Sequence, residues 1–218
     1  MPRWTVANQK ITNAREAFNE NKEEAKKVEA ATKAVGAAEE AKTDATKKVA
    51  QDLVTALKNG AEKDALQVRL NKIETVEDTE RAATNGVEEL EALVKGDLTT
   101  EENLVAAETK SMEVSKMLEK LANDELSLKL MPRWTVANQK ITNAREAFNE
   151  NKAVQAINSA TSETMGQAIN ENAEILGLDL TEYNKLSNKT SVESALIGKN
   201  FENKTEVKEA FDNAVKAE

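Results

Sequence analysis

One 22-residue sequence occurs twice in this chain. The string MPRWTVANQKITNAREAFNENK occupies positions 1–22 and returns unchanged at 131–152. Apolar residues in the first copy recur at alternating intervals of three and four, which places their side chains along one seam of an α-helix. These residues are Trp4, Ala7, Ile11, Ala14 and Phe18. The only prolines, Pro2 and Pro132, suit the first turn of a helix, where the missing N–H removes no hydrogen bond.

The composition indicates a purely helical protein. Of the 218 residues 39% are apolar, but only 3% are aromatic and seven are glycine. Abundant alanine, glutamate and lysine favour helices, whereas bulky residues for a deep globular core are few. We therefore expect an all-α fold of elongated, tandem three-helix bundles that share long connecting helices, followed by a small C-terminal helical module.

The residue types exclude most catalytic chemistry. The chain has no cysteine and no histidine, so it lacks thiolates, disulfides and the commonest general base and metal ligand. Neighbouring carboxylates such as Glu23 and Glu24 point to different sides of a helix, and nothing apolar surrounds them to raise their pKa. Neither a calcium loop nor a glycine-rich phosphate loop is found. We expect no enzyme activity, no catalytic or metal-binding residue and no cofactor.

The net charge of −9 is unevenly distributed. Each repeat carries four basic and two acidic residues, a net charge of +2, so the remaining segments together carry −13. An acidic chain disfavours nucleic acid as a partner, because phosphates are neutralised by clustered lysine and arginine. The sequence has no apolar run of about 18 residues, so we expect no membrane insertion.

The repeats supply the candidate residues for binding an anionic polymer. A basic helix face with an exposed tryptophan is one way to bind an anionic polymer, although a solvated helix flank is the favoured interpretation. The candidates for polymer binding are Arg3, Trp4, Lys10, Arg15, Arg133, Trp134, Lys140 and Arg145.

The first domain is expected at residues 1–77. A long helix should run from about 3 to 41 and end at a break over 42–44 that offers an N-cap. A second helix, marked by Val49, Leu53, Ala56 and Leu57, should end at Asn59-Gly60. A third should begin near residue 61 and present Leu66, Leu70 and Ile73 on one face.

The second domain is expected at residues 78–152. The third helix should continue into it, with a soft interruption at 84–86, and Thr99 and Glu102 have the spacing of a capping box for the next helix. That helix should bury an apolar face. Leu126, Leu130 and then the second repeat should form a closing helix that continues through Val154 and Ile157. The expected face comprises Leu104, Val105, Met112, Val114, Met117, Leu118 and Leu121.

The third domain, residues 153–218, should contain short helices separated at Gly177, Asn188, Gly198 and Asn203. Its bulky residues, Tyr183, Phe201 and Phe211, should form its core, although Tyr183 is also a candidate for stacking on carbohydrate. Thr190 and Glu193 form a second capping-box pair. Residues 188–190 and 203–205 match the glycosylation acceptor pattern, but both should lie at helix starts, where capping is the favoured role.

Residues 34–74 (AVGAAEEAKTDATKKVAQDLVTALKNGAEKDALQVRLNKIE) resemble a known repeat type. An Ala/Glu helix, a polar turn, an A-x-x-L-V-x-x-L helix, a turn with glycine and an E-K-x-x-L-x-x-R-L helix follow one another. This order is similar to the three-helix repeats of surface-layer and other cell-wall proteins of Gram-positive bacteria. Lys58 and Asn59 stand where those repeats have Pro-Asp. The matching residues are Ala50, Leu53, Val54, Leu57, Gly60, Glu62, Lys63, Leu66, Arg69 and Leu70.

Residues 176–215 (LGLDLTEYNKLSNKTSVESALIGKNFENKTEVKEAFDNAV) resemble a second repeat type, found in exported proteins of Bacillota. The two resemblances imply an extracellular protein of the cell surface or cell wall. They imply a structural scaffold or spacer, with other surface-layer subunits or a cell-wall polymer as partners. The alternative is a binding module that recognises a wall glycopolymer or a host protein through a helix face. Exposure of Trp4, Trp134 or Tyr183 beside an arginine or lysine would favour binding, and burial of all three would favour the scaffold.

The two repeats should both be helical but differently buried. Their identical sequence determines the periodic face, whereas the flanking segments decide what covers it. Phe148 has chain on both sides, so it should be more buried than Phe18.

Overall fold

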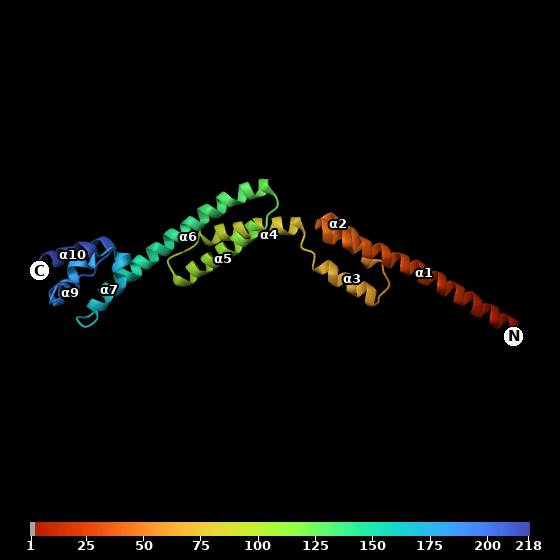
Figure 1. The fold of residues 1–218 in the computed structure, drawn as a ribbon, viewed down its shortest axis with the longest axis horizontal. Coiled ribbons are helices and arrows are strands. Elements are labelled where there is room, and N and C mark those ends of the chain that lie inside the picture. The colour runs from red at the N-terminus through yellow and green to blue at the C-terminus, as the bar shows by residue number, and fades with distance from the viewer. Residues whose placement is uncertain (1–2) are drawn as a thin grey trace. The chain divides into compact units, whose positions relative to one another are not determined.

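The computed structural model describes residues 3–218, and this part of the chain contains ten helices and no strand (Figure 1). The all-α class is therefore confirmed. The expected place of Pro2 in a first helical turn lies outside the described residues. The helices are α1 (Arg3–Ala41), α2 (Asp44–Thr55), α3 (Ala61–Asn71), α4 (Val76–Leu93), α5 (Glu101–Glu119), α6 (Asp124–Asn158), α7 (Met165–Leu176), α8 (Leu180–Tyr183), α9 (Thr190–Leu196) and α10 (Lys204–Lys216).

The chain divides into two compact units, and the division passes through α4, α5 and α6. The first comprises Met1–Val87 and Ser115–Met131, and the second comprises Glu88–Val114 and Pro132–Glu218. Each unit contains its own apolar core cluster. The domain boundaries at residues 77 and 152 and the elongated tandem arrangement remain sequence-based predictions.

In the first unit, α1 packs against α2 and α3. Its Ala31, Val35 and Ala38 are fully buried, and so are Ala50 and Val54 of α2. Small residues on both helices allow their backbones to approach closely. The core cluster also contains Leu57. It includes Leu66, Leu70 and Ile73, the three residues that were expected on one face of the third helix.

Of the four residues expected to mark the second helix, only Leu57 is buried. Val49 is 58% exposed and Leu53 is 37% exposed, whereas Ala50 and Val54 face α1 and α3. The pair Val49 and Leu53 and the pair Ala50 and Val54 have the same four-residue spacing on this helix. The larger side chains of the first pair favoured it, but the second pair is the buried one. The start of α2 is as predicted: the Thr43 hydroxyl accepts a hydrogen bond from the Thr46 N–H at 3.3 Å.

The expected continuation of the third helix into the next domain was also wrong. Helix α3 ends at Asn71 and α4 begins at Val76, and α4 then passes through residues 84–86 without interruption. The buried Thr75 accounts for this break. Its hydroxyl accepts from the Asp78 N–H at 3.1 Å and donates to Asp44 at 2.6 Å, while Asp78 accepts from the Thr75 N–H at 3.3 Å. This reciprocal capping starts a new helix.

In the second unit, α4, α5 and α6 run side by side (Figure 1). The buried seam of α5 there is Leu104, Ala107, Ser111 and Val114. Val105 and Met112, expected on this face, are 47% and 60% exposed. The polar Ser111 occupies the seam position instead, which apolar periodicity alone did not indicate.

The caps of α5 and α6 differ in detail from the prediction. The hydroxyl of Thr100 accepts from the Asn103 N–H at 3.3 Å, whereas the Thr99 hydroxyl donates to Asp97 at 2.6 Å. The capping box at Thr99 was therefore displaced by one residue. Asn123 caps the start of α6, accepting from the Leu126 N–H at 3.2 Å.

Pro132 lies inside α6 rather than in a first turn, which contradicts the expectation from the repeat. The residues that precede the second copy are helical, so the helix begins at Asp124, upstream of the proline. A proline in a helix interior removes one hydrogen bond and costs roughly 3 kcal/mol. Packing on both sides of this position must offset that cost.

The C-terminal helices of the second unit enclose the other core cluster. Tyr183 and Phe211 are fully buried and Phe201 is 9% exposed, which confirms the predicted core. Ala153, Val154 and Ile157 of α6 belong to the same cluster. Gly177 closes α7 in the left-handed conformation, with φ of 66°, and the Asn203 side chain caps α10 by accepting from the Glu206 N–H at 3.1 Å.

Candidate functional site

Two arginines of the second repeat form bidentate contacts with carboxylates of neighbouring helices. Arg133 donates to both carboxylate oxygens of Glu91 on α4, at 2.9 and 2.8 Å. Arg145 donates to both oxygens of Glu108 on α5, at 2.7 and 2.9 Å, and to Glu101 at 2.8 Å. Such fork-shaped pairs add geometric specificity to charge attraction. They therefore fix α6 in one register against α4 and α5.

Trp134 and Asn138 join α6 to the polar seam residue of α5. The Trp134 indole N–H lies 3.0 Å from the Ser111 hydroxyl oxygen and 3.1 Å from the Ser111 carbonyl oxygen. The Ser111 hydroxyl in turn donates to Asn138 at 2.8 Å. The buried hydroxyl and the indole thus satisfy each other, as buried polar groups require.

These contacts change the acidity of the groups involved. The guanidinium groups of Arg133 and Arg145 hold the pKa values of Glu91 and Glu108 below the usual glutamate value, chiefly through hydrogen bonds. The pKa of Arg145 is raised, first by its hydrogen bonds to Glu108 and then by those to Glu101. These groups stay ionised at neutral pH as structural pairs.

The same sequence is exposed in the first repeat. Residues 4–22 of α1 are all exposed to solvent. Trp4, Ile11 and Phe18 expose 76%, 54% and 68% of their surface, whereas Ile141 exposes 3% and Phe148 is half-buried. The expectation that the two copies are helical but differently buried is confirmed. The side chain of Arg3 lies outside the described part of the chain.

The structure therefore separates the candidate polymer-binding residues into two groups. Lys10 and Arg15 are exposed on α1 together with Trp4, and Lys140 is exposed on α6. Arg133 and Arg145 are engaged with carboxylates, and Trp134 is half-buried and hydrogen-bonded. In the second repeat, the arginines and the tryptophan thus hold helices together.

Tyr183 lies inside the C-terminal core and not at a surface where carbohydrate could stack on it. Its ring is 5.5 Å from that of Phe211, and its hydroxyl donates to Glu193 at 2.8 Å. Burial, followed by the Glu193 carboxylate, raises the pKa of Tyr183. The predicted capping box of Thr190 and Glu193 was wrong, because Thr190 is the first residue of α9 and the Glu193 N–H donates to the Lys189 carbonyl at 3.0 Å. The Thr190 N–H donates a hydrogen bond to the Asn188 side-chain oxygen at 3.0 Å.

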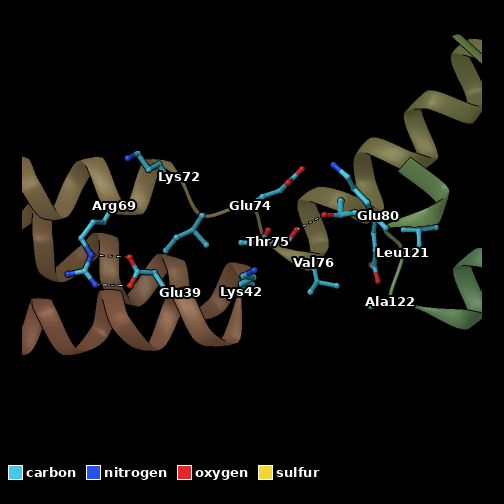
Figure 2. A pocket seen from close by; sticks show the side chains of 13 residues that line it. Glu39, Lys42, Arg69, Lys72, Glu74, Thr75, Val76, Glu80, Leu121 and Ala122 are labelled. Atoms are coloured by element: carbon cyan, nitrogen blue, oxygen red, sulfur yellow. Dashed lines mark hydrogen bonds and ion pairs between the residues drawn. The ribbon is translucent and has the colours of Figure 1, made fainter. Parts of the chain in front are cut away.

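A cavity of about 540 Å³ lies beside the loop between α3 and α4 in the first unit (Figure 2). Figure 2 shows Arg69 and Glu39 facing each other at one side of it, with bonds of 2.9 and 2.7 Å. The Arg69 guanidinium holds the pKa of Glu39 below its usual value. On the other side, the Thr79 hydroxyl donates to the Thr75 carbonyl at 3.1 Å. The Arg69–Glu39 pair joins α3 to α1, and the Thr79–Thr75 bond lies at the first turn of α4, so the cavity borders a structural junction.

Sequence reasoning missed the acidic partners of the second repeat, namely Glu91, Glu101 and Glu108, and the hydroxyl of Ser111. The sequence contains a signal for Ser111 but none for the three glutamates. Ser111 continues the spacing of four and three set by Leu104, Ala107 and Val114, and a single serine in an apolar seam indicates a buried hydrogen bond. The partner of each glutamate depends on tertiary packing, which the sequence of the repeat does not contain.

Comparison with known proteins gives no relative for this chain. No protein family, curated protein or solved structure matches it. Within the described residues, no helix is long and apolar enough to cross a membrane. The same residues contain no group of three or more acidic side chains arranged to hold a metal ion.

Proposed function

We propose that this chain is a non-catalytic structural element, a scaffold or spacer, of a bacterial surface-layer or cell-wall-associated protein. The proposal rests on one observation, which is that three side chains of the second repeat contact neighbouring helices. Arg133, Trp134 and Arg145 serve helix packing. A spacer needs such contacts, because its function is to hold neighbouring segments at a fixed separation.

Helix α6 supports the same proposal within the second unit. Its residues 133–145 pack on α4 and α5, and its Ala153, Val154 and Ile157 enter the C-terminal core. One continuous helix thus belongs to two packing regions, and a helix transmits position over its length at roughly 1.5 Å per residue. The surface location and the surface-layer class rest on the two sequence resemblances.

A second function is favoured by the first repeat alone. Trp4, Lys10 and Arg15 stand exposed on α1, as a binding face for a wall polymer would require. Its charges are spread along the helix, so such binding would be weak and salt-sensitive.

Retention on purified cell-wall sacculi, with and without their attached polymers, tests both functions. The variant Lys10→Glu with Arg15→Glu removes the exposed basic face and leaves the second repeat intact. Retention that requires the polymers and is lost in this variant would establish the binding module. If the chain is not retained even at low salt, the scaffold function remains and the polymer-binding function is rejected.

The spacer function has its own test in small-angle X-ray scattering. Linked bundles should give a radius of gyration well above the value of roughly 17 Å expected for a compact globule of this length. A value close to the compact one would reject the spacer.

A further inference from the structure

The second repeat shows what kind of surface the first repeat fits. The residues of α6 that contact α4 and α5 have identical counterparts 130 positions earlier in the chain. Asn8 and Arg15 correspond to Asn138 and Arg145, and Trp4 corresponds to Trp134. In the first copy this face is helical and exposed. The chain therefore presents, in folded form, a second copy of a face whose partner surface is known from α4 and α5.

The partner surface is strongly acidic. The part of the α4–α5 hairpin that belongs to the second unit is residues 88–114. It contains eight acidic and two basic residues. The repeat has a net charge of +2. Opposite charges draw the two surfaces together and disfavour wrong partners. Two first repeats facing each other would instead bring like charges together.

The contacts are also chemically selective. Arg145 needs a carboxylate that accepts two parallel hydrogen bonds, as Glu108 does. Trp134 needs an acceptor inside an apolar seam, and the hydroxyl of Ser111 supplies it. An anionic polymer offers charges to Arg15 but no apolar seam for Trp4, Ile11 and Phe18.

We propose that the first repeat, residues 3–22, is a docking helix for an acidic two-helix hairpin that presents the same surface as residues 88–114. This partner hairpin has carboxylates at the positions that correspond to Glu91 and Glu108. At the position that corresponds to Ser111 it has a hydroxyl group, which lies between apolar residues. Because α1 is already helical over this stretch, binding does not require a disordered segment to fold, and little affinity is lost to ordering. This inference is independent of the polymer-binding and spacer functions.

The probe is a second full-length copy of the chain whose own α6 no longer covers the hairpin. This acceptor chain carries Trp134→Ala and Ile141→Asp, which remove the indole and place a charge in the seam. It also carries Trp4→Ala and Ile11→Asp, so its first repeat cannot dock. The acceptor contains no tryptophan, because Trp4 and Trp134 are the only two.

The donor chain carries Trp134→Phe, so Trp4 is its only tryptophan. We expect Trp4 fluorescence to shift to shorter wavelength on titration with the acceptor, and sedimentation to show a 1:1 complex. Arg15→Glu in the donor should weaken binding by at least about tenfold, since it replaces the counterpart of the forked Arg145. Lys22→Glu changes the net charge equally but alters the counterpart of the exposed Lys152, so it should weaken binding far less. A partner chain with Trp4→Phe and Trp134→Phe has no tryptophan and keeps Ile141, so α6 still covers its hairpin and it should give no shift.

Several outcomes would overturn the proposal. Equal losses for Arg15→Glu and Lys22→Glu would show unspecific charge attraction, and a Trp4 shift in the donor alone on concentration would show pairing between first repeats. Circular dichroism checks that the acceptor remains helical. If it does not, a milder acceptor with only Trp4→Ala and Trp134→Ala replaces it. Absence of binding to the folded acceptor up to about 1 mM, a typical effective concentration for a short tether, would reject the docking helix.

Discussion

The indole nitrogen of Trp134 lies 3.0 Å from the hydroxyl oxygen of Ser111, and this contact distinguishes two segments of identical sequence. Trp4, its counterpart in the first repeat, is 76% exposed. The two copies share one local hydrogen bond: Gln9 donates to Asn13 and Gln139 donates to Asn143, both at 2.8 Å. The identical sequence thus makes both copies helical, and the flanking segments determine which contacts each copy forms with other helices.

Truncating the same isoleucine in each repeat should have different effects on stability. Ile141→Ala removes a side chain that is only 3% exposed, and such truncations cost about 2 to 5 kcal/mol. Ile11→Ala removes a side chain that is 54% exposed and should change stability by no more than about 0.5 kcal/mol. Urea unfolding followed by circular dichroism measures both. Equal shifts in the two midpoints would show that the copies are equally buried.

Arg145→Gln should raise the pKa of Glu108 toward its ordinary value. In the folded chain the pKa of Glu108 is lowered from 4.5, mainly by its hydrogen bond to Arg145. A lowered pKa contributes stability that is present above the unfolded value and lost as the pH falls through the folded value. The variant should therefore be less stable than the unmodified chain at neutral pH, and this difference should shrink as the pH falls below about 4.5. Carboxyl titration by NMR measures the change, with Arg15→Gln as a control that leaves the Glu108 titration unaltered.

Removing the Thr75 hydroxyl should destabilise the junction between α3 and α4. This hydroxyl accepts from the Asp78 N–H and donates to Asp44, and Thr75 is fully buried. Thr75→Ala should cost about 1 to 3 kcal/mol, the range for a lost cap and unsatisfied polar partners. Thr75→Ser keeps the hydroxyl and should cost less. If serine and alanine destabilise equally in thermal unfolding, the hydroxyl has no capping role.

The single tyrosine should resist ionisation as long as the C-terminal core is folded. Burial and the Glu193 carboxylate raise the pKa of Tyr183 above its usual value. A raised pKa contributes stability below the unfolded value of about 10, and this contribution is lost as the pH rises through the folded value. Tyrosinate absorbance should therefore be low at about pH 11 in the folded chain and appear on unfolding in urea. Titration at the ordinary value in the folded chain would contradict the burial of the phenol.

Apolar periodicity predicted the long helices well. The limits of α1 at residues 3 and 41, and the continuity of the second repeat with Val154 and Ile157, follow from patterns within a single helix. The face of α2 did not follow, because Val49 and Leu53 compete with Ala50 and Val54 at the same spacing. Which stripe is buried depends on how closely α1 approaches.

The candidate site was predictable in its residues but not in their roles. The repeat indicated Arg133, Trp134 and Arg145 as distinctive side chains, yet their partners come from helices 23 to 44 positions away. Pro132 was assigned to a first helical turn by analogy with Pro2, although the expected closing helix already included Leu126 and Leu130 upstream of it. The capping role of Thr75 was not predicted, because its partner is Asp78, whereas both predicted capping boxes pair a threonine with a glutamate.

Amide hydrogen exchange measured by NMR tests the central claim most directly. Intrinsic exchange rates depend on local sequence, so they are the same at matched positions within the two repeats, and any difference in protection reports the surrounding structure. We predict that amides of residues 137–148 are protected at least about tenfold more than those of residues 7–18, because only the second copy is covered by α4 and α5. Equal protection at matched positions would contradict the account, since it would show that identical sequences experience identical surroundings.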